Sequence, residues 1–302
     1  MTQFDFMSKR RVAYAISILL MVLAIGALAF KGLNLGLDFT GGTQIEVRYA
    51  QAPELDEVRS QLEEADFGNH VVQTFGADTD ILVRLQQSYD ESVGDQVVQA
   101  LRANGGQVDL VRAEYVGAQV GDQLRDQSGL GMLLALGVVS LYVAFRFQYK
   151  FAIGALASLG HDVVIVLGLF ALLDLNFDLT VLAAVLAVIG YSLNDTIVVY
   201  DRIRENIRRS QSSDLVKICN DAINQTLART LATSGTTLLV LLALYFLGGD
   251  MIHNFSLALI AGIGLGTFSS IYVAAALLLA MKLEREDLIP VKKENPAEEE
   301  LP

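Results

Sequence analysis

The sequence contains no tryptophan, a single cysteine and three histidines among its 302 residues. The lone Cys219 excludes an internal disulfide framework and any zinc site built from several cysteines. Without tryptophan, an aromatic belt at a membrane surface must consist of tyrosine and phenylalanine. The three histidines are scattered along the chain, so a Ser-His-Asp triad is not expected.

Motifs for nucleotides and nucleic acids are also missing. The sequence has no Walker-type phosphate loop, and Gly262-Ile263-Gly264-Leu265-Gly266 lacks the spacing of a dinucleotide fingerprint. Basic residues form no sustained face outside short flanks of apolar segments, so nucleic acid is not an expected partner. We therefore expect no enzyme activity, no catalytic residue, no metal and no nucleotide cofactor.

Long apolar segments dominate what is present. Hydrophobic residues make up 53% of the chain, and the mean hydropathy is +0.44. Segments of about twenty apolar residues are long enough to cross a bilayer. The sequence predicts a polytopic α-helical membrane protein with six transmembrane helices, over residues 12–31, 128–145, 151–173, 179–200, 231–248 and 254–281.

The first apolar segment has an alternative interpretation as a signal peptide. Ala27-Leu28-Ala29 fits a cleavage site. The uncharged run over residues 12–30 is longer than the usual signal core of about 7–15 residues, which favours an uncleaved helix.

Basic residues indicate the orientation. Lys and Arg concentrate in residues 1–11, in the loop 146–150 and in residues 201–230. Because basic loops stay in the cytoplasm, we expect both termini there, with 201–230 as an amphipathic cytoplasmic loop. The charged tail, residues 282–302, is expected to be disordered.

Residues 32–127 form a different kind of segment, polar and acidic. They contain 6 Arg, no Lys and 17 Asp and Glu, which gives a net charge of −11. Hydrophobic periodicity predicts an external, periplasmic α+β domain with a βαββαβ, ferredoxin-like order. The expected strands are 43–49, 71–75, 81–85 and 107–116, and the expected helices are 54–65 and 91–103.

Asp195 is the first candidate functional residue. It lies about 9 Å inside the fourth apolar segment from the exit at Asp201-Arg202, at roughly 1.5 Å per residue. A carboxylate at that depth costs at least a few kcal/mol unless it is paired, hydrated or protonated. Tyr191 and Ser192 share its helix face. The alternative is that Asp195 marks an early helix end and meets headgroup water.

Arg229, Thr233 and Thr237 stack at the start of the fifth apolar segment. One interpretation is that Arg229 meets Asp195 across adjacent helices, where attraction and desolvation oppose each other in setting the carboxylate pKa. The other is an ordinary basic flank with threonines bonded to backbone carbonyls.

His161-Asp162 lies near the middle of the third segment, far from either helix end. It is either a structural hydrogen bond to a neighbouring helix or partner, or a second proton-relay site. A metal site is not expected, because adjacent helix residues point to different faces. Gly262 and Gly266 form a small-xxx-small pair that favours close helix contact.

The chain resembles the SecF subunits of bacterial SecD–SecF complexes, over about residues 8–283. Three motifs carry the resemblance: residues 36–43 with Asp38, Gly41 and Gly42, residues 189–206 with Gly190 and Asn194, and residues 229–237. The six-helix layout with one external module also resembles half of an RND-superfamily transporter, whose other half would be SecD.

This resemblance implies a role in late protein translocation across the bacterial inner membrane, driven by the proton-motive force. It implies SecD, the SecYEG translocon, a YajC-like accessory subunit and an unfolded polypeptide as partners. It places Asp195, Arg229 and Thr233 in the proton pathway, with Asp250 as the nearest candidate for a further acid. His161-Asp162 fits the pattern without a defined role.

Two rival functions remain open at this point. The chain could be a half-subunit of an RND-type lipid or small-molecule exporter, which would need an external pocket. It could also be a structural subunit that scaffolds a partner, in which case changes at Asp195 or Arg229 would be tolerated.

Overall fold

Six helices long and apolar enough to cross a membrane form the body of the protein, in agreement with the sequence prediction. The computed structural model describes residues 4–68, 70–85, 92–103, 105, 107–209 and 214–283. The long helices are α1 (Arg10–Phe30), α5 (Ala118–Arg146), α6 (Tyr149–Leu172), α7 (Leu179–Arg209), α8 (Leu215–Leu247) and α9 (Asp250–Ser269). A short 3₁₀ helix, η1 (Met7–Lys9), precedes α1, and a π-helical stretch, η2 (Ser270–Ala274), joins α9 to α10 (Ala275–Ala280).

The helices run further than the apolar windows indicate. The expected loop over residues 201–230 is wrong, since α7 continues to Arg209 and α8 begins at Leu215. Ion pairs along the helix surface, Arg202 to Glu205 and Arg209 to Glu205, support the polar end of α7 beyond the apolar span. Similarly, α5 begins at Ala118, inside the stretch assigned to the external domain. Most of the tail lies outside the described residues.

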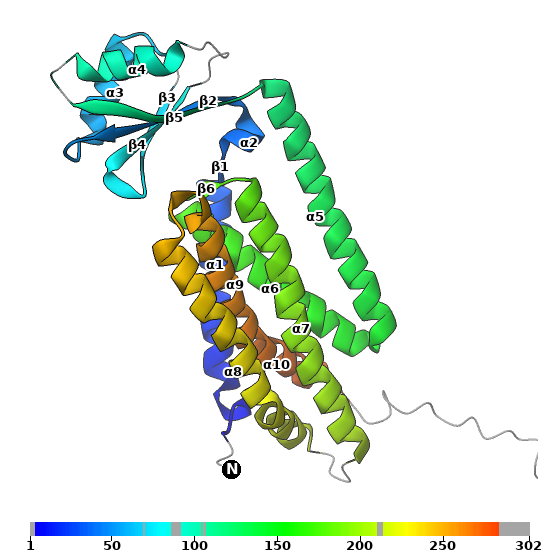
Figure 1. Cartoon of the computed structure of the whole chain (residues 1–302). Helices are drawn as coiled ribbons and strands as arrows, with labels where there is room; N and C mark the ends of the chain where they lie inside the picture. Colours follow the sequence, from blue (N-terminus) through cyan, green and yellow to red (C-terminus); the bar gives the residue numbers. More distant parts are fainter. Residues whose placement is uncertain are drawn as a thin grey trace, which may run out of the picture.

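The external module has the predicted βαββαβ order. It consists of β2 (Gly42–Tyr49), α3 (Leu55–Glu64), β3 (His70–Phe75), β4 (Ala77–Leu85), α4 (Val93–Arg102) and β5 (Val108–Val116). The antiparallel sheet has the order β3-β4-β2-β5, as in a split βαβ fold. Both helices cover one face of the sheet (Figure 1), where Ile45 and Val47 pack against Leu62, Val97 and Leu101.

A short junction ties this module to the bundle. Strand β1 (Asn34–Leu35) pairs in parallel with β6 (Asn176–Phe177), which lies between α6 and α7. Arg84 of β4 donates hydrogen bonds to the side chains of Asn34 and Asn176 and to the Leu35 carbonyl. The junction therefore holds the module on the loop that leads into α7.

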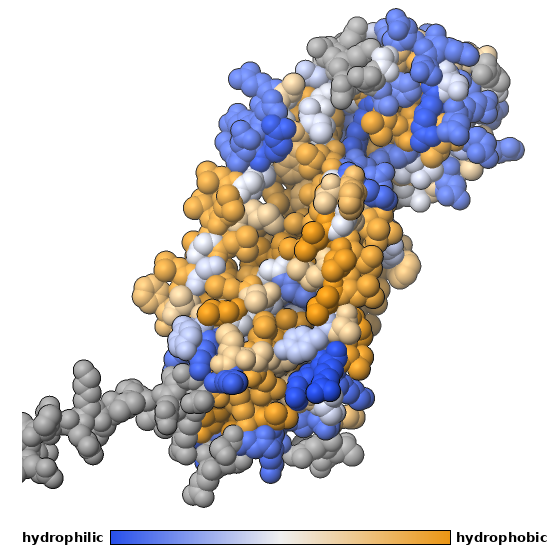
Figure 2. All heavy atoms as spheres, turned by 180° about the vertical axis from the view of Figure 1, so that it is seen from behind, coloured by the Kyte–Doolittle hydropathy of each residue, from blue (hydrophilic) through white to orange (hydrophobic). Residues whose placement is uncertain are grey.

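Within the bundle, α6, α7 and α9 are the most buried long helices, and α5 lies apart. In α6, in α7 and in the span that begins with α9, half or more of an apolar 18-residue segment is buried inside the protein. In α5, only 6% of the corresponding segment is buried. Figure 1 shows α5 descending beside the other helices, joined to β5 of the module at its upper end and to α6 at its lower end. Apolar side chains form a broad band between two hydrophilic ends (Figure 2), as expected for a surface in contact with lipid.

Candidate functional site in the helix bundle

Two carboxylates lie buried among the membrane-spanning helices. Asp162 of α6 has 0% of its surface exposed and Asp195 of α7 has 3%. Neither can meet bulk water at these exposures, so each must be stabilised by neighbouring polar groups or by loss of its charge. The hydrogen bonds around each show how the protein does this.

Asp162 is bound by groups from three helices. Its Oδ2 accepts hydrogen bonds from Ser192 Oγ of α7 and Ser269 Oγ of α9, both at 2.6 Å. Its Oδ1 lies 2.9 Å from His161 Nδ1. The site joins α6, α7 and α9 at one point.

The contact between His161 and Asp162 corrects an expectation. Neighbouring helix residues were expected to point to different faces, yet the imidazole turns back to meet the carboxylate. The other ring nitrogen, His161 Nε2, is buried without a hydrogen-bond partner among the described residues. Those residues also contain no cluster of three or more His, Cys, Asp or Glu that could hold a metal.

Asp195 begins a second polar chain, through α8 to α9. Ser234 Oγ of α8 donates to Asp195 Oδ2 at 3.3 Å. Thr267 Oγ1 of α9 in turn donates to Ser234 Oγ at 2.8 Å. Hydroxyl groups both donate and accept, so the hydrogen bonds of this chain can reverse direction when the hydroxyls rotate.

Arg229 does not pair with Asp195 in this structure. Its side chain is exposed, and no ion pair within 4.0 Å joins the two residues in the described part of the chain. The guanidinium nevertheless lies within electrostatic range of the carboxylate. The expected partner is therefore replaced by Ser234, which the sequence analysis did not single out.

The other predicted residues near Asp195 face in different directions. Thr233 is exposed and donates to the carbonyls of Arg229 and Thr230 on its own helix. Tyr191 bonds Thr237 of α8 at 3.1 Å, whereas Ser192 turns to Asp162. Tyr191, Ser192 and Asp195 were predicted to share one helix face. Each of them instead bonds a different residue: Thr237, Asp162 and Ser234, respectively.

Glycines allow α7 and α9 to approach closely at this level. A Cβ atom on Gly262 would lie 2.1 Å from Val188 Cγ2, and one on Gly266 would lie 3.0 Å from Ser192 Cβ. Close approach through small residues is typical of helix packing in membranes. The close approach at Gly266 brings Ser192 of α7 and Ser269 of α9 near enough to each other for both hydroxyls to bind Asp162 Oδ2.

Residues Asp38, Gly41 and Gly42 lie at the outer end of the same helix system. Asp38 Oδ2 accepts a hydrogen bond from the Leu179 backbone N–H, the first residue of α7, at 3.0 Å. Gly41 has a φ of +66°, and a Cβ there would lie 2.7 Å from Ala118 Cα of α5. This motif therefore fixes the module against both α5 and α7, through the short helix α2 (Leu37–Thr40).

Gly190 and Asn194 are exposed on one side of α7. A Cβ on Gly190 would meet no atom within 4 Å. Neither residue takes part in the buried polar chains. Asp250 is the first residue of α9, and its side chain lies outside the described part of the structure.

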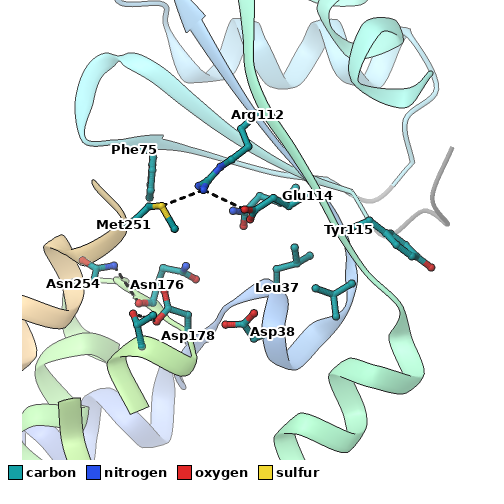
Figure 3. A pocket seen from close by; sticks show the side chains of 13 residues that line it. Leu37, Asp38, Phe75, Arg112, Glu114, Tyr115, Asn176, Asp178, Met251 and Asn254 are labelled. Carbon is teal, nitrogen blue, oxygen red and sulfur yellow. Dashed lines mark hydrogen bonds and ion pairs between the residues drawn. The ribbon is translucent and has the colours of Figure 1, made fainter. Parts of the chain in front are cut away.

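A cavity of about 490 Å³ lies between the module and the bundle (Figure 3). Arg112 of β5 reaches across it to Met251 Sδ at the start of α9, at 3.4 Å, and pairs with Glu114 of its own strand at 3.2 Å. Asp38 and Asp178 line its floor. The module thus touches α9 as well as α7.

The fold and this site define a class of protein: a polytopic membrane protein with an external α+β module and two buried carboxylates linked across its helices. The sequence matches the family described as protein export membrane protein SecD/SecF, C-terminal, over residues 96–284, and the SecD/SecF GG motif over residues 26–53. The chain belongs to the SecD/SecF family of protein-export membrane proteins.

Named relatives point to one branch of this family. The chain is 54% identical to the protein translocase subunit SecF of Pseudomonas aeruginosa over 288 residues, covering 95% of this chain and 94% of that protein. It is 46% identical to SecF of Vibrio alginolyticus, covering 98% and 96%. These similarities establish a role in protein translocation.

Solved structures agree with the fold. The SecDF crystal structure from Thermus thermophilus superposes with a TM-score of 0.85 at 41% identity, covering 93% of this chain and 39% of the SecDF chain. SecDF in its super-membrane-facing form gives a TM-score of 0.69 at 40% identity, with the same coverage. The present chain therefore spans about two fifths of the SecDF chain.

Proposed function

We propose that this chain is the SecF subunit of a bacterial inner-membrane complex that uses the proton-motive force to assist late stages of protein translocation. SecD supplies the other half of the complex, by analogy with the solved SecDF chains, which are more than twice as long. SecYEG and a YajC-like subunit are further partners. Both termini lie in the cytoplasm and the acidic module lies in the periplasm.

The observation that carries this proposal is the hydroxyl chain at Asp195. Asp195, Ser234 and Thr267 lie on three different helices, so a change in the carboxylate charge alters bonds between α7, α8 and α9 at once. Arg229 lies within electrostatic range but outside contact. Movement of α8 toward α7 would pair the guanidinium with the deprotonated carboxylate, and protonation would release it.

Asp162 has a different part in this mechanism. Its three polar partners and complete burial make it a fixed joint rather than a group that exchanges ions with either side. The joint holds α6, α7 and α9 together, so a shift at Asp195 moves these helices as one unit against α8. That unit carries the junction on which the external module stands.

The energies suit a switch between two states. One charge that crosses about 100 mV releases roughly 2.3 kcal/mol, and each pH unit adds about 1.4 kcal/mol. A single proton is too weak for a large stroke against a load, but it suffices to bias an element with two stable positions. The module then holds or releases an emerging polypeptide as α7 shifts.

Proteoliposomes that contain the chain with SecD and SecYEG test this function directly. We expect Asp195→Asn to abolish the stage of export that depends on the proton-motive force, while the protein stays in the membrane. Asp122→Asn, at an exposed carboxylate near the outer end of α5, is the matched control. Separate H⁺ and Na⁺ gradients identify the coupling ion, and normal export by Asp195→Asn would overturn the proposal.

The cavity at the junction favours one alternative, an RND-type exporter of lipids or small molecules. Such an exporter needs an external pocket, and about 490 Å³ is in the usual range for small ligands. A photo-crosslinking side chain at Tyr115, which lines the cavity, separates the two functions. Exported polypeptide in the crosslink supports translocation, and a lipid or small molecule supports the exporter.

A further inference from the structure

A second cavity, of about 410 Å³, lies at the end of the bundle away from the external module. It is formed where α5 ends and where the polar extension of α7 passes beneath it. Its lining combines four arginines with two carboxylates: Arg146, Asp201, Arg204, Glu205, Arg208 and Arg209. The cavity therefore has an excess of positive charge.

Ion pairs within the cavity neutralise only part of this charge. Asp201 accepts two hydrogen bonds from Arg146 Nη2, at 2.7 and 3.0 Å. Glu205 is shared between Arg202 and Arg209, each at 2.8 Å. Both carboxylates are thus already engaged by arginines before any other cation is considered.

These ion pairs do not include two arginines of the cavity lining, Arg204 and Arg208. In the described part of the chain, neither Arg204 nor Arg208 makes an ion pair. Arg204 Nε is buried and has no hydrogen-bond partner among those residues. A buried donor on a charged group without a partner costs free energy, so this position favours an anion that accepts from it.

The level of the cavity matches the headgroups of a bilayer. Tyr142, Phe145 and Tyr149 are 51%, 84% and 63% exposed around the same end of α5, as in an aromatic belt. Above them, α5 exposes apolar side chains and lies apart from the bundle (Figure 1). An acyl chain can therefore lie along α5 while its headgroup reaches the arginines.

We propose that this cavity binds the phosphate of an anionic phospholipid headgroup, through Arg204 and Arg208. Basic pockets between transmembrane helices at the cytoplasmic surface bind such headgroups in other membrane proteins. The adjoining apolar surface of α5 favours a lipid over free phosphate, which has no acyl chains to place there. The bound lipid would bridge α5 and α7 beside the ion pair of Arg146 and Asp201. The proposal does not depend on proton coupling.

The absence of tryptophan makes a direct binding measurement possible. Phe145→Trp introduces a single fluorophore beside the cavity in the full chain. The reconstituted protein is titrated with brominated phosphatidylglycerol or brominated phosphatidylcholine, and quenching gives the relative binding constant of each lipid. We expect phosphatidylglycerol to bind several-fold more strongly than phosphatidylcholine.

Three variants in the reporter background test the assignment. The double change Arg204→Gln and Arg208→Gln should bring the ratio of the two binding constants close to one. Arg204→Lys with Arg208→Lys keeps the charge and should keep most of the preference, which also shows that these positions tolerate substitution. Arg125→Gln, at the opposite end of α5, should leave the ratio unchanged.

Competition with inorganic phosphate shows whether the arginines bind a phospholipid headgroup or free phosphate. If the site takes a lipid, millimolar phosphate should not reduce quenching by brominated phosphatidylglycerol. An unchanged lipid preference in the double Gln variant would overturn the proposal, as would displacement of the lipid by phosphate at that concentration.

Discussion

Asp38, at the base of the external module, accepts a hydrogen bond at 3.0 Å from the backbone N–H of Leu179, the residue that begins α7. The same helix carries Asp195, about four and a half turns further along. The first backbone N–H groups of a helix lack hydrogen-bond partners within the helix. A carboxylate at this end accepts a hydrogen bond from one of them and interacts favourably with the positive end of the helix dipole. Here that carboxylate comes from another element, and the bond links module to helix.

A first prediction concerns this link. Asp38→Ala should cost about 1 kcal/mol of stability, as the loss of a helix cap usually does, and should weaken export assisted by the proton-motive force. The matched control is Asp178→Ala, because Asp178 caps the same helix locally, accepting from Val181 N at 2.9 Å and from Thr180 Oγ1 at 2.6 Å. Thermal unfolding in detergent and an export assay measure the two effects.

Similar losses of stability are expected for these two variants, with a larger loss of export for Asp38→Ala. If both variants reduced export equally, the bond from Leu179 to Asp38 would only cap α7 and would have no separate role in export.

A second prediction concerns the joint at Asp162. Side-chain hydrogen bonds between membrane helices contribute about 0.6 kcal/mol on average and at most about 1.7 kcal/mol, so Ser192→Ala and Ser269→Ala should each destabilise the bundle by an amount of that order. Both serines bind the same oxygen, so their effects should not add, and a double-mutant cycle should give a coupling of at least about 0.5 kcal/mol. Ser8→Ala, at an exposed hydroxyl near the N-terminus, is the control for serine removal. Additive losses would mean that the two serines act independently.

The external module offers a third prediction, on pH. Arg48 binds Asp80 through two hydrogen bonds, at 2.7 and 2.8 Å, and holds the pKa of that carboxyl below its usual value. A depressed pKa in the folded state stabilises the module above the unfolded pKa of about 3.9, and this contribution is lost as the pH falls through the folded value. Hydrogen exchange of the β4 amides, corrected for intrinsic rates, should show protection falling below about pH 4.

Asp80→Asn should remove the part of this pH dependence that Asp80 supplies and lower protection at neutral pH. Asp56→Asn is the control, because Asp56 pairs with Arg59 on an exposed helix surface and its side chain is 95% exposed. Exposed pairs of that kind contribute about 0–1 kcal/mol. An identical pH profile for Asp80→Asn and the unchanged protein would contradict the prediction.

The module and the spans were predictable from the sequence because their signals are periodic. Alternation of apolar residues located β2, and helical spacing located α3 and α4 within a residue or two. The junction was not predictable, since β1 and β6 have two residues each, and so short a pair leaves no pattern. The polar extension of α7 was missed because high hydropathy marks only the part of a helix that lies in lipid, whereas α7 continues into water.

The partner of Asp195 could not be read from the sequence for a related reason. Arg229, Thr233 and Ser234 all lie on α8, and successive residues on a helix point about 100° apart. Which of them faces α7 depends on the rotation of α8, which is set by packing along its whole length. Ser269 was missed because one hydroxyl in an apolar segment carries little signal, although it follows Gly266 by one turn.

A fourth prediction tests the close packing of α7 against α9. Gly262→Ala would place a Cβ 2.1 Å from Val188 Cγ2 and 2.7 Å from Val188 Cγ1, so the helices must separate or Val188 must leave its position. Overpacking of this kind costs about 1–3 kcal/mol. Separation would also pull Ser192 and Ser269 away from a common position on Asp162. We therefore expect loss of both thermal stability and export.

Two further variants make the interpretation of Gly262→Ala specific. Gly264→Ala is the control, because a Cβ there meets no atom within 4 Å, and it should leave stability and export nearly unchanged. Val188→Ala removes the two methyl groups that clash and leaves only a 3.0 Å contact between Cβ atoms. Combined with Gly262→Ala, it should therefore restore part of the lost stability. If Gly264→Ala were as harmful as Gly262→Ala, the effect would come from glycine removal in general, because alanine at Gly264 meets no neighbouring helix.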